Sequence, residues 1–91
     1  TLHFKEARHY RNIDLAYQVL EQGGTAGTIF NAANEIAVEA FLNGQIKFTS
    51  IADIVSKVLE NIRIRPEPGL ADVFETDRQT RELTRQEIDQ L

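Results

Sequence analysis

The sequence contains no cysteine, no methionine and no tryptophan. The absence of cysteine excludes a disulfide framework and a thiolate metal site, and it fits a reducing compartment. The absence of methionine, in a chain that begins at Thr1, leads us to expect a piece of a longer polypeptide.

Long apolar runs and an excess of positive charge are also missing. The longest strongly apolar stretch, Glu35 to Leu42, is far shorter than the roughly 20 residues that cross a bilayer, so we expect no membrane partner. The net charge of −4 argues against a nucleic-acid partner. A chain of 91 residues makes one small domain and leaves no room for a cofactor-binding domain beside it.

The apolar spacing predicts an all-α fold, a small four-helix bundle-like domain with short extended leading and connecting segments. Residues 1–11 are expected to be an extended segment from a missing upstream domain, and residues 12–91 the helical domain. The first helix should follow a cap at Asn12 and end at Gly23 and Gly24. Its predicted apolar stripe consists of Ile13, Ala16, Tyr17 and Leu20.

The second helix should be capped by Thr25 and ended by Gly44. It is apolar nearly all round, which is typical of a central helix. One stripe contains Ile29, Ala33, Ile36 and Ala40, and the far side carries Val38 and Leu42. Ile46 and Phe48 predict a short extended link to the next helix.

The third helix should be capped by Thr49 or Ser50 and has the clearest stripe: Ile51, Ile54, Val55, Val58, Leu59 and Ile62. Two prolines then predict a stiff loop over residues 65–69. Thr76 and Gln79 have capping-box spacing, which predicts that a last helix starts there and reaches Leu91. Its weak stripe, Leu83, Ile88 and Leu91, suggests a helix on the outside.

Asn31 and Asn34 are the most unusual polar pair, because two amides three residues apart share one helix face. Val38 on the same face suggests burial. We therefore interpret both amides as structural polar residues that hydrogen-bond neighbouring segments. Contacts with a ligand or with another domain are the alternatives.

Two acidic residues and an arginine stripe have competing interpretations. Glu35 and Glu39 are one helical turn apart, but di-metal bundles need more carboxylates and usually a histidine at the position of Val38, so a solvated acidic face is favoured over a metal site. Arg78, Arg81 and Arg85 could grip phosphate, but the acidic residues among them favour local ion pairs.

Other signs of chemistry are weak. Gly23, Gly24 and Thr25 before a helix resemble part of an anion site, but a helix-to-helix turn is favoured without the full glycine spacing. The chain has no Gly-x-Ser-x-Gly elbow. We predict no catalytic, cofactor-binding or metal-binding residue in this chain.

Several runs carry a family resemblance that covers essentially the whole chain: 15–17 (LAY), 23–25 (GGT), 31–42 (NAANEIAVEAFL) and 46–51 (IKFTSI). The chain resembles the C-terminal domain of 1-deoxy-D-xylulose 5-phosphate reductoisomerases. This implies a homodimeric NADPH-dependent enzyme of non-mevalonate isoprenoid biosynthesis that uses Mg or Mn, located in the cytoplasm or, in plant-type sources, the plastid.

The resemblance also implies a division of labour. NADPH binding and catalysis would belong to upstream domains of the same polypeptide, and this domain would brace them, with no family site residue carried over. One rival is an independent helical protein-interaction module. Another is a small phosphate-binding enzyme that uses Thr25 and the arginines, but it lacks a candidate base. If a catalytic domain is missing, an abnormally apolar surface patch is expected.

Overall fold

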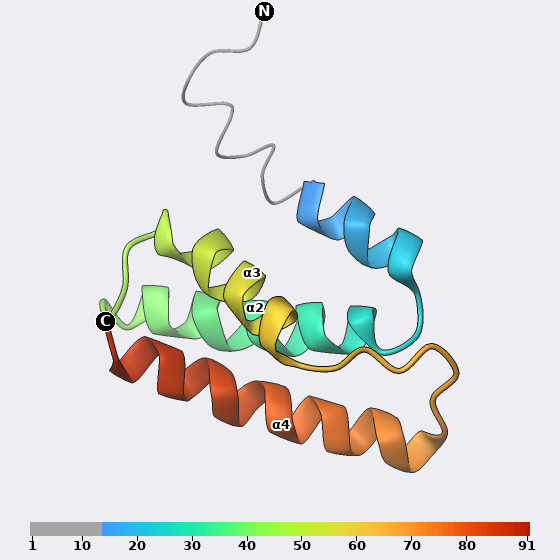
Figure 1. Ribbon diagram of the computed structural model, residues 1–91. Helices are drawn as coiled ribbons and strands as arrows, with labels where there is room; N and C mark the ends of the chain where they lie inside the picture. The colour runs from blue at the N-terminus through green and yellow to red at the C-terminus, as the bar shows by residue number, and fades with distance from the viewer. Residues whose placement is uncertain (1–13) are drawn as a thin grey trace, which may run out of the picture.

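The computed structural model describes residues 14–91 (Figure 1). The predicted leading segment 1–11, the cap at Asn12 and the stripe residue Ile13 lie outside the described residues. Over the described range the chain forms a helix at residues 14–22, then α2 (Ala26–Leu42), α3 (Ser50–Asn61) and α4 (Leu70–Asp89), with no strand. The all-α prediction is therefore confirmed.

The helix at residues 14–22 presents a different face from the predicted one. Leu15 and Val19 are buried and border the same small hollow as Leu59 of α3, whereas Tyr17 and Leu20 are 64% and 76% exposed. Leu15 and Val19 are themselves one helical turn apart, so periodicity alone fits either face. Contact with α3 decides between them, and the predicted stripe is wrong.

Helix α2 lies at the centre of the bundle, as its composition predicts. It packs on both α3 and α4, and its buried side consists of Ala26, Ile29, Ala32, Ala33, Ile36, Ala37 and Ala40. After Asn43, Gly44 adopts a positive φ of 77°. The Gly44 and Gln45 amides donate to the carbonyls of Phe41 and Ala40 at 3.0 and 2.9 Å, which makes the predicted helix end a Schellman motif.

Residues 43–49 form turns and bends rather than the extended link that Ile46 and Phe48 predict. Ile46 is buried in the core, while Phe48 is 52% exposed. Thr49 occupies the N-cap position of α3, as predicted, although its side chain makes no capping hydrogen bond. The predicted α3 stripe is confirmed: Ile51, Ile54, Val55 and Val58 are buried in the core, with Leu59 and Ile62 packed beside them.

Helix α4 begins at Leu70, so the predicted start at Thr76 is wrong. Gly69 is the N-cap, and the carboxylate of Asp72 accepts a hydrogen bond from its amide at 3.0 Å. The same carboxylate pairs with Arg65 at 2.5 Å. The negative charge of Asp72 in the first turn is also attracted to the positive N-terminal end of the helix dipole. These contacts fix the N-cap at Gly69, directly after Pro68.

Thr76 is instead part of the inner face of α4, together with Thr80, Thr84 and Ile88, all of them buried. The hydroxyls of Thr80 and Thr84 donate to the carbonyls of Thr76 and Thr80 at 2.7 and 2.6 Å. With its hydroxyl turned back onto its own helix, a threonine presents mainly its methyl group to the core. Of the predicted stripe, Ile88 is buried, Leu83 is half-buried and Leu91 is 75% exposed, so only part of that stripe packs on the core.

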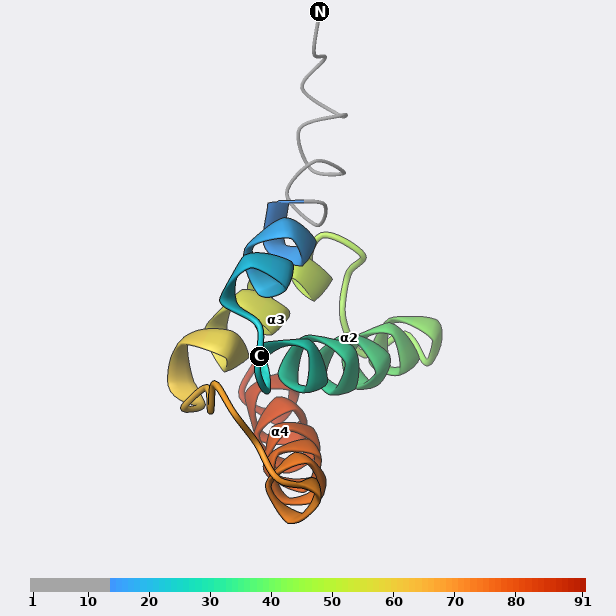
Figure 2. The same cartoon turned by 90° about the vertical axis from the view of Figure 1, so that its right-hand side faces the viewer.

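The helices are arranged around α2 (Figures 1 and 2). Helix α3 runs back along one side of α2, and α4 crosses beneath in the same direction as α2. The helix at residues 14–22 lies over α3, on the side away from α4. None of the described helices is long and apolar enough to cross a membrane.

Candidate functional site

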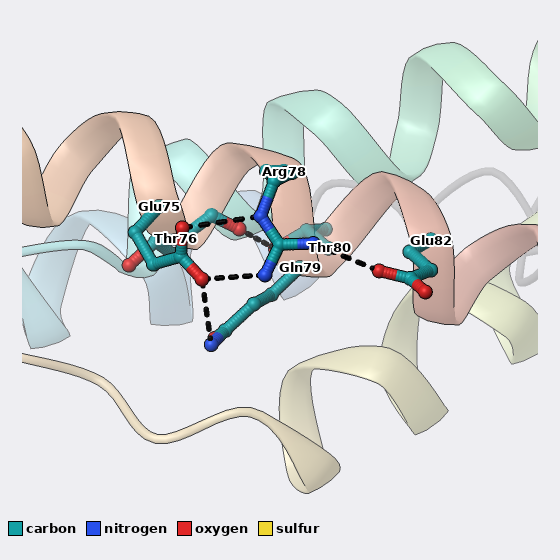
Figure 3. A network of polar contacts seen from close by, with 6 residues as sticks. All are labelled: Glu75, Thr76, Arg78, Gln79, Thr80 and Glu82. Atoms are coloured by element: carbon teal, nitrogen blue, oxygen red, sulfur yellow. Dashed lines mark hydrogen bonds and ion pairs between the residues drawn. The ribbon is translucent and has the colours of Figure 1, made fainter.

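Arg78 is the centre of a polar network on the exposed side of α4 (Figure 3). Its guanidinium donates two hydrogen bonds to Glu75, at 2.5 and 3.1 Å, and one to Glu82 at 3.0 Å. Gln79 also donates to Glu75, at 3.3 Å. The partners lie three or four residues apart, which is the spacing that lets helix side chains meet. The predicted local ion pairing is confirmed for Arg78.

Arg81 links two helices. It donates to Asp77 of its own helix at 2.9 Å and to Glu35 of α2 at 3.1 Å. Glu35 is exposed, which agrees with the predicted solvated acidic face, and it also forms an interhelical ion pair. Lys57 of α3 and Glu87 of α4 form a second such bridge at 2.9 Å. Each pair is partly exposed, so it contributes more to the geometry of the helices than to stability.

The charges of this network are held in their ionised forms. The hydrogen bond from Arg78 lowers the pKa of the Glu75 carboxyl below its ordinary value. The pKa of Arg78 is raised mainly by its hydrogen bond to Glu75, and that of Arg81 by its hydrogen bonds to Glu35 and then Asp77. Arg78 and Arg81 are thus already neutralised by carboxylates, which leaves them poorly suited to bind a phosphate.

Thr25 forms a junction between two loops. Its amide donates to the carbonyl of Arg65 at 3.0 Å, and its hydroxyl oxygen accepts from the Arg65 amide at 2.8 Å. Thr25 is fully buried. It does occupy the N-cap position of α2, but its side chain bonds Arg65 instead of capping the helix. The Thr25 amide is already used and its hydroxyl oxygen is engaged with the Arg65 amide, so the geometry favours a helix-to-helix turn over an anion site at residues 23–25.

Gly24 makes the close approach at this junction possible. It has a positive φ of 56°, and a Cβ added there would lie 2.1 Å from the Arg65 carbonyl oxygen and 2.8 Å from the Cα of Pro66. Only glycine leaves room for the second loop at that position. The adjacent Gly23 has a similar φ of 65°, but open space surrounds it.

The two predicted structural amides are less buried than expected. Asn31 is exposed and Asn34 is half-buried, both on the outer side of α2. The expected burial is therefore wrong for Asn31, because α3 and α4 cover the opposite side of the helix. Within the described part of the chain, neither amide has a hydrogen-bond partner. Their structural role remains a prediction.

A small cleft lies between the C-terminal ends of α2 and α4. Its volume is about 210 Å³, and it is lined by Ile36, Glu39, Ala40, Asn43, Gln45, Arg85, Ile88 and Asp89. Arg85 thus faces a mixed polar and apolar hollow, apart from the Arg78 network. In residues 14–91, no group of three or more histidine, cysteine or acidic side chains could hold a metal ion.

Sequence reasoning missed most of these contacts. It identified Thr25 as a capping residue, but not its bonds to Arg65, which is 40 residues away in the chain. It also did not identify Asp72 as the side chain that accepts a hydrogen bond from the Gly69 amide at the start of α4. Two features of the sequence could have indicated these contacts. The paired glycines before Thr25 allow another segment to approach closely, and the spacing from Gly69 to Asp72 is that of a helix N-cap and its partner.

A family model described as "DXP reductoisomerase C-terminal domain" matches residues 1–83. The chain belongs to this family. The match includes α2, α3, the Thr25–Arg65 junction and most of α4, and therefore all of the described core except Thr84 and Ile88. The resemblance inferred from the runs around Asn31 and Ile46 is confirmed.

Curated relatives carry the name 1-deoxy-D-xylulose 5-phosphate reductoisomerase. A protein from Dechloromonas aromatica is 48% identical over 81 residues, which are 89% of this chain and 20% of the relative. Proteins from Halalkalibacterium halodurans and Bacillus subtilis are 44% and 42% identical, over 88% and 89% of the chain and 22% of each relative. The chain therefore spans about one fifth of the length of these relatives.

Proposed function

We propose that this chain is the structural C-terminal domain of a reductoisomerase that converts 1-deoxy-D-xylulose 5-phosphate to 2-C-methyl-D-erythritol 4-phosphate with NADPH, in non-mevalonate isoprenoid biosynthesis. The observation that carries the proposal is the family match over residues 1–83. The names of relatives that are more than 40% identical support the activity of the whole protein.

The domain contributes rigidity rather than chemistry. Its strongest polar groups are used internally: Arg78 and Arg81 bind carboxylates, and Thr25 binds the Arg65 backbone. The described residues do not fit NADPH or a divalent metal, since the turn before α2 is closed by Arg65 and no ligand cluster is formed there. We assign both groups, Mg or Mn being the metal, to other domains of the same polypeptide.

The proposal extends to the assembly and location of the whole enzyme. The partners of this domain are the NADPH-binding and catalytic domains of its own chain, and the full-length protein is a homodimer in the cytoplasm. The family resemblance and the bacterial origin of the relatives support this assignment.

The test is NADPH oxidation by the full-length protein and by the 91-residue chain, each with 1-deoxy-D-xylulose 5-phosphate and Mg. Activity in the full-length protein alone is the expected result. Activity of the short chain would contradict the structural role. Inactivity of both would favour an independent protein-interaction module, for which the exposed outer side of α2 offers a surface.

A further inference from the structure

One side of α2 carries no charge. At about 100° per residue, the side chains within an arc of about 120° include none that is ionisable. They are Gly27, Phe30, Asn31, Asn34, Val38, Phe41 and Leu42. We refer to Asn31, Asn34, Val38, Phe41 and Leu42 as the neutral α2 face.

This face is most open at its C-terminal end, whereas Asn34 and Val38 are half-buried and Val38 packs against the core. Leu42 is 75% exposed and Phe41 is 36% exposed. Phe48, from the loop after α2, extends the face, because its ring packs edge-on against Phe41 with centroids 5.5 Å apart. Figure 2 shows α3 on one flank of α2, and within residues 14–91 no helix covers the opposite flank. Leu42, Phe41 and Phe48 thus form a group of exposed apolar side chains, and such a group is typical of a binding surface.

Exposed hydrophobic residues also occur away from this face: Tyr17 and Leu20 in the helix at residues 14–22, Leu91 after α4, and two at the start of α4. Leu70 and Phe74 begin α4, where Asp72 and Glu75 alternate with them. The acidic residues of α2 itself lie on its α4 side, where Glu35 binds Arg81. The charges of α2 thus lie on the side of its packed neighbour, and the other side is neutral, with Asn31 at its edge bordering a hollow that Val73 and Phe74 of α4 also line.

We propose that the neutral α2 face is the surface on which the larger, preceding part of the full-length polypeptide docks. The inference rests on the proposed function. About four fifths of each relative lies outside this chain, so a large covalently linked partner is available. A linked partner docks at a high effective concentration, so a surface of modest size is enough to hold it.

The chemistry of the face defines its partner. The exposed parts of Phe41 and Leu42 favour an apolar surface opposite them. The amides of Asn31 and Asn34, which have no partner among residues 14–91, can each donate to and accept from backbone or amide groups. A charged surface would lose its hydration without gaining an ion pair here. The docking surface is therefore apolar and amide-bearing, like other contacts between domains of one chain.

The test compares thiol labelling of Leu42→Cys and Leu70→Cys in the full-length protein. The two leucines are 75% and 73% exposed in this domain, so they are closely matched. Each variant is labelled with a maleimide, native and in urea, and the cysteine-bearing peptide is quantified by mass spectrometry. We expect folding to slow labelling at position 42 by about tenfold or more, because a docked surface reacts only when it opens.

Four outcomes would overturn the proposal or its premise. Labelling of Leu42→Cys at the same rate in the native protein as in urea would show that nothing covers the face. Protection that disappears on dilution would show that a second copy covers it instead of the linked domains. Full-length protein that is active but unprotected would overturn the docking surface alone, whereas inactive protein would count against the proposed function itself.

Discussion

Replacing Gly24 by alanine should break the junction that joins the turn before α2 to the loop before α4. Alanine at a φ of 56° costs about 1–2 kcal/mol through its left-handed backbone. Its Cβ would also lie 2.1 Å from the Arg65 carbonyl oxygen, so the second loop must move away. Movement of that loop would break the two Thr25–Arg65 hydrogen bonds, each of which contributes about 1 kcal/mol to the free energy of unfolding.

The free energy of unfolding should therefore fall by about 3 kcal/mol or more in Gly24→Ala. Gly23→Ala is the matched control, because its φ of 65° carries the same backbone cost but its Cβ meets nothing within 4 Å. The control should lose only about 1–2 kcal/mol. Urea unfolding followed by circular dichroism measures both values, and equal destabilisation of the two variants would refute the account of the junction.

Three further predictions concern single side chains. Thr25→Val removes the acceptor for the Arg65 amide and should cost about 1–3 kcal/mol in urea unfolding, whereas Thr25→Ser, which keeps the hydroxyl, should retain most of the stability. Asn31→Ala should change the stability of the isolated domain by less than about 0.5 kcal/mol, because the residue is exposed; a larger loss would support the structural role predicted from the sequence. The lowered pKa of Glu75 means that its contribution is present at neutral pH and is lost as the pH falls through that pKa. The melting temperatures of wild type and Glu75→Gln should therefore differ most near pH 7 and converge in acid, and a constant difference would contradict the Arg78 pair.

The sequence predicted those elements whose signals are local. The Gly44 helix end was predictable because a positive φ favours glycine, and the α3 stripe because apolar residues there follow one helical period without a competing face. The helix at residues 14–22 offered two faces of similar quality, Tyr17 with Leu20 or Leu15 with Val19. Only its contact with α3 distinguishes them, and that information is not local.

The start of α4 was missed because capping was sought in hydroxyl side chains. Thr76 and Gln79 have the usual spacing, but Gly69 and Asp72 stand earlier in the chain at the same spacing and are the pair that acts. Once the helix has started, Thr76 falls in its interior, where sequence scales treat threonine as polar. The hydroxyl of the neighbouring Thr80 donates a hydrogen bond to the Thr76 carbonyl, so this polar group is satisfied within the helix and the threonine methyl can face the core.

The same limit explains why the Thr25–Arg65 junction could not be predicted. A cap position before a helix calls for a hydroxyl or amide side chain, and Thr25 meets that requirement. Its actual partner lies 40 residues later, in a loop whose sequence shows only that prolines stiffen it. Gly24 signals the close approach through its lack of a side chain, but it does not reveal which backbone approaches.

Helix α2 connects these observations to function. A helix that is packed on one side needs one apolar stripe, and α2 has that stripe against α3 and α4. Its outer side adds neutral residues beyond that stripe: Val38 still packs against the core, but Asn31 and Leu42 are exposed. They are consistent with a helix that is central to a larger molecule, with this bundle on one side and the rest of the enzyme on the other. Protection of Leu42→Cys in the full-length protein is the measurement that separates this explanation from chance exposure.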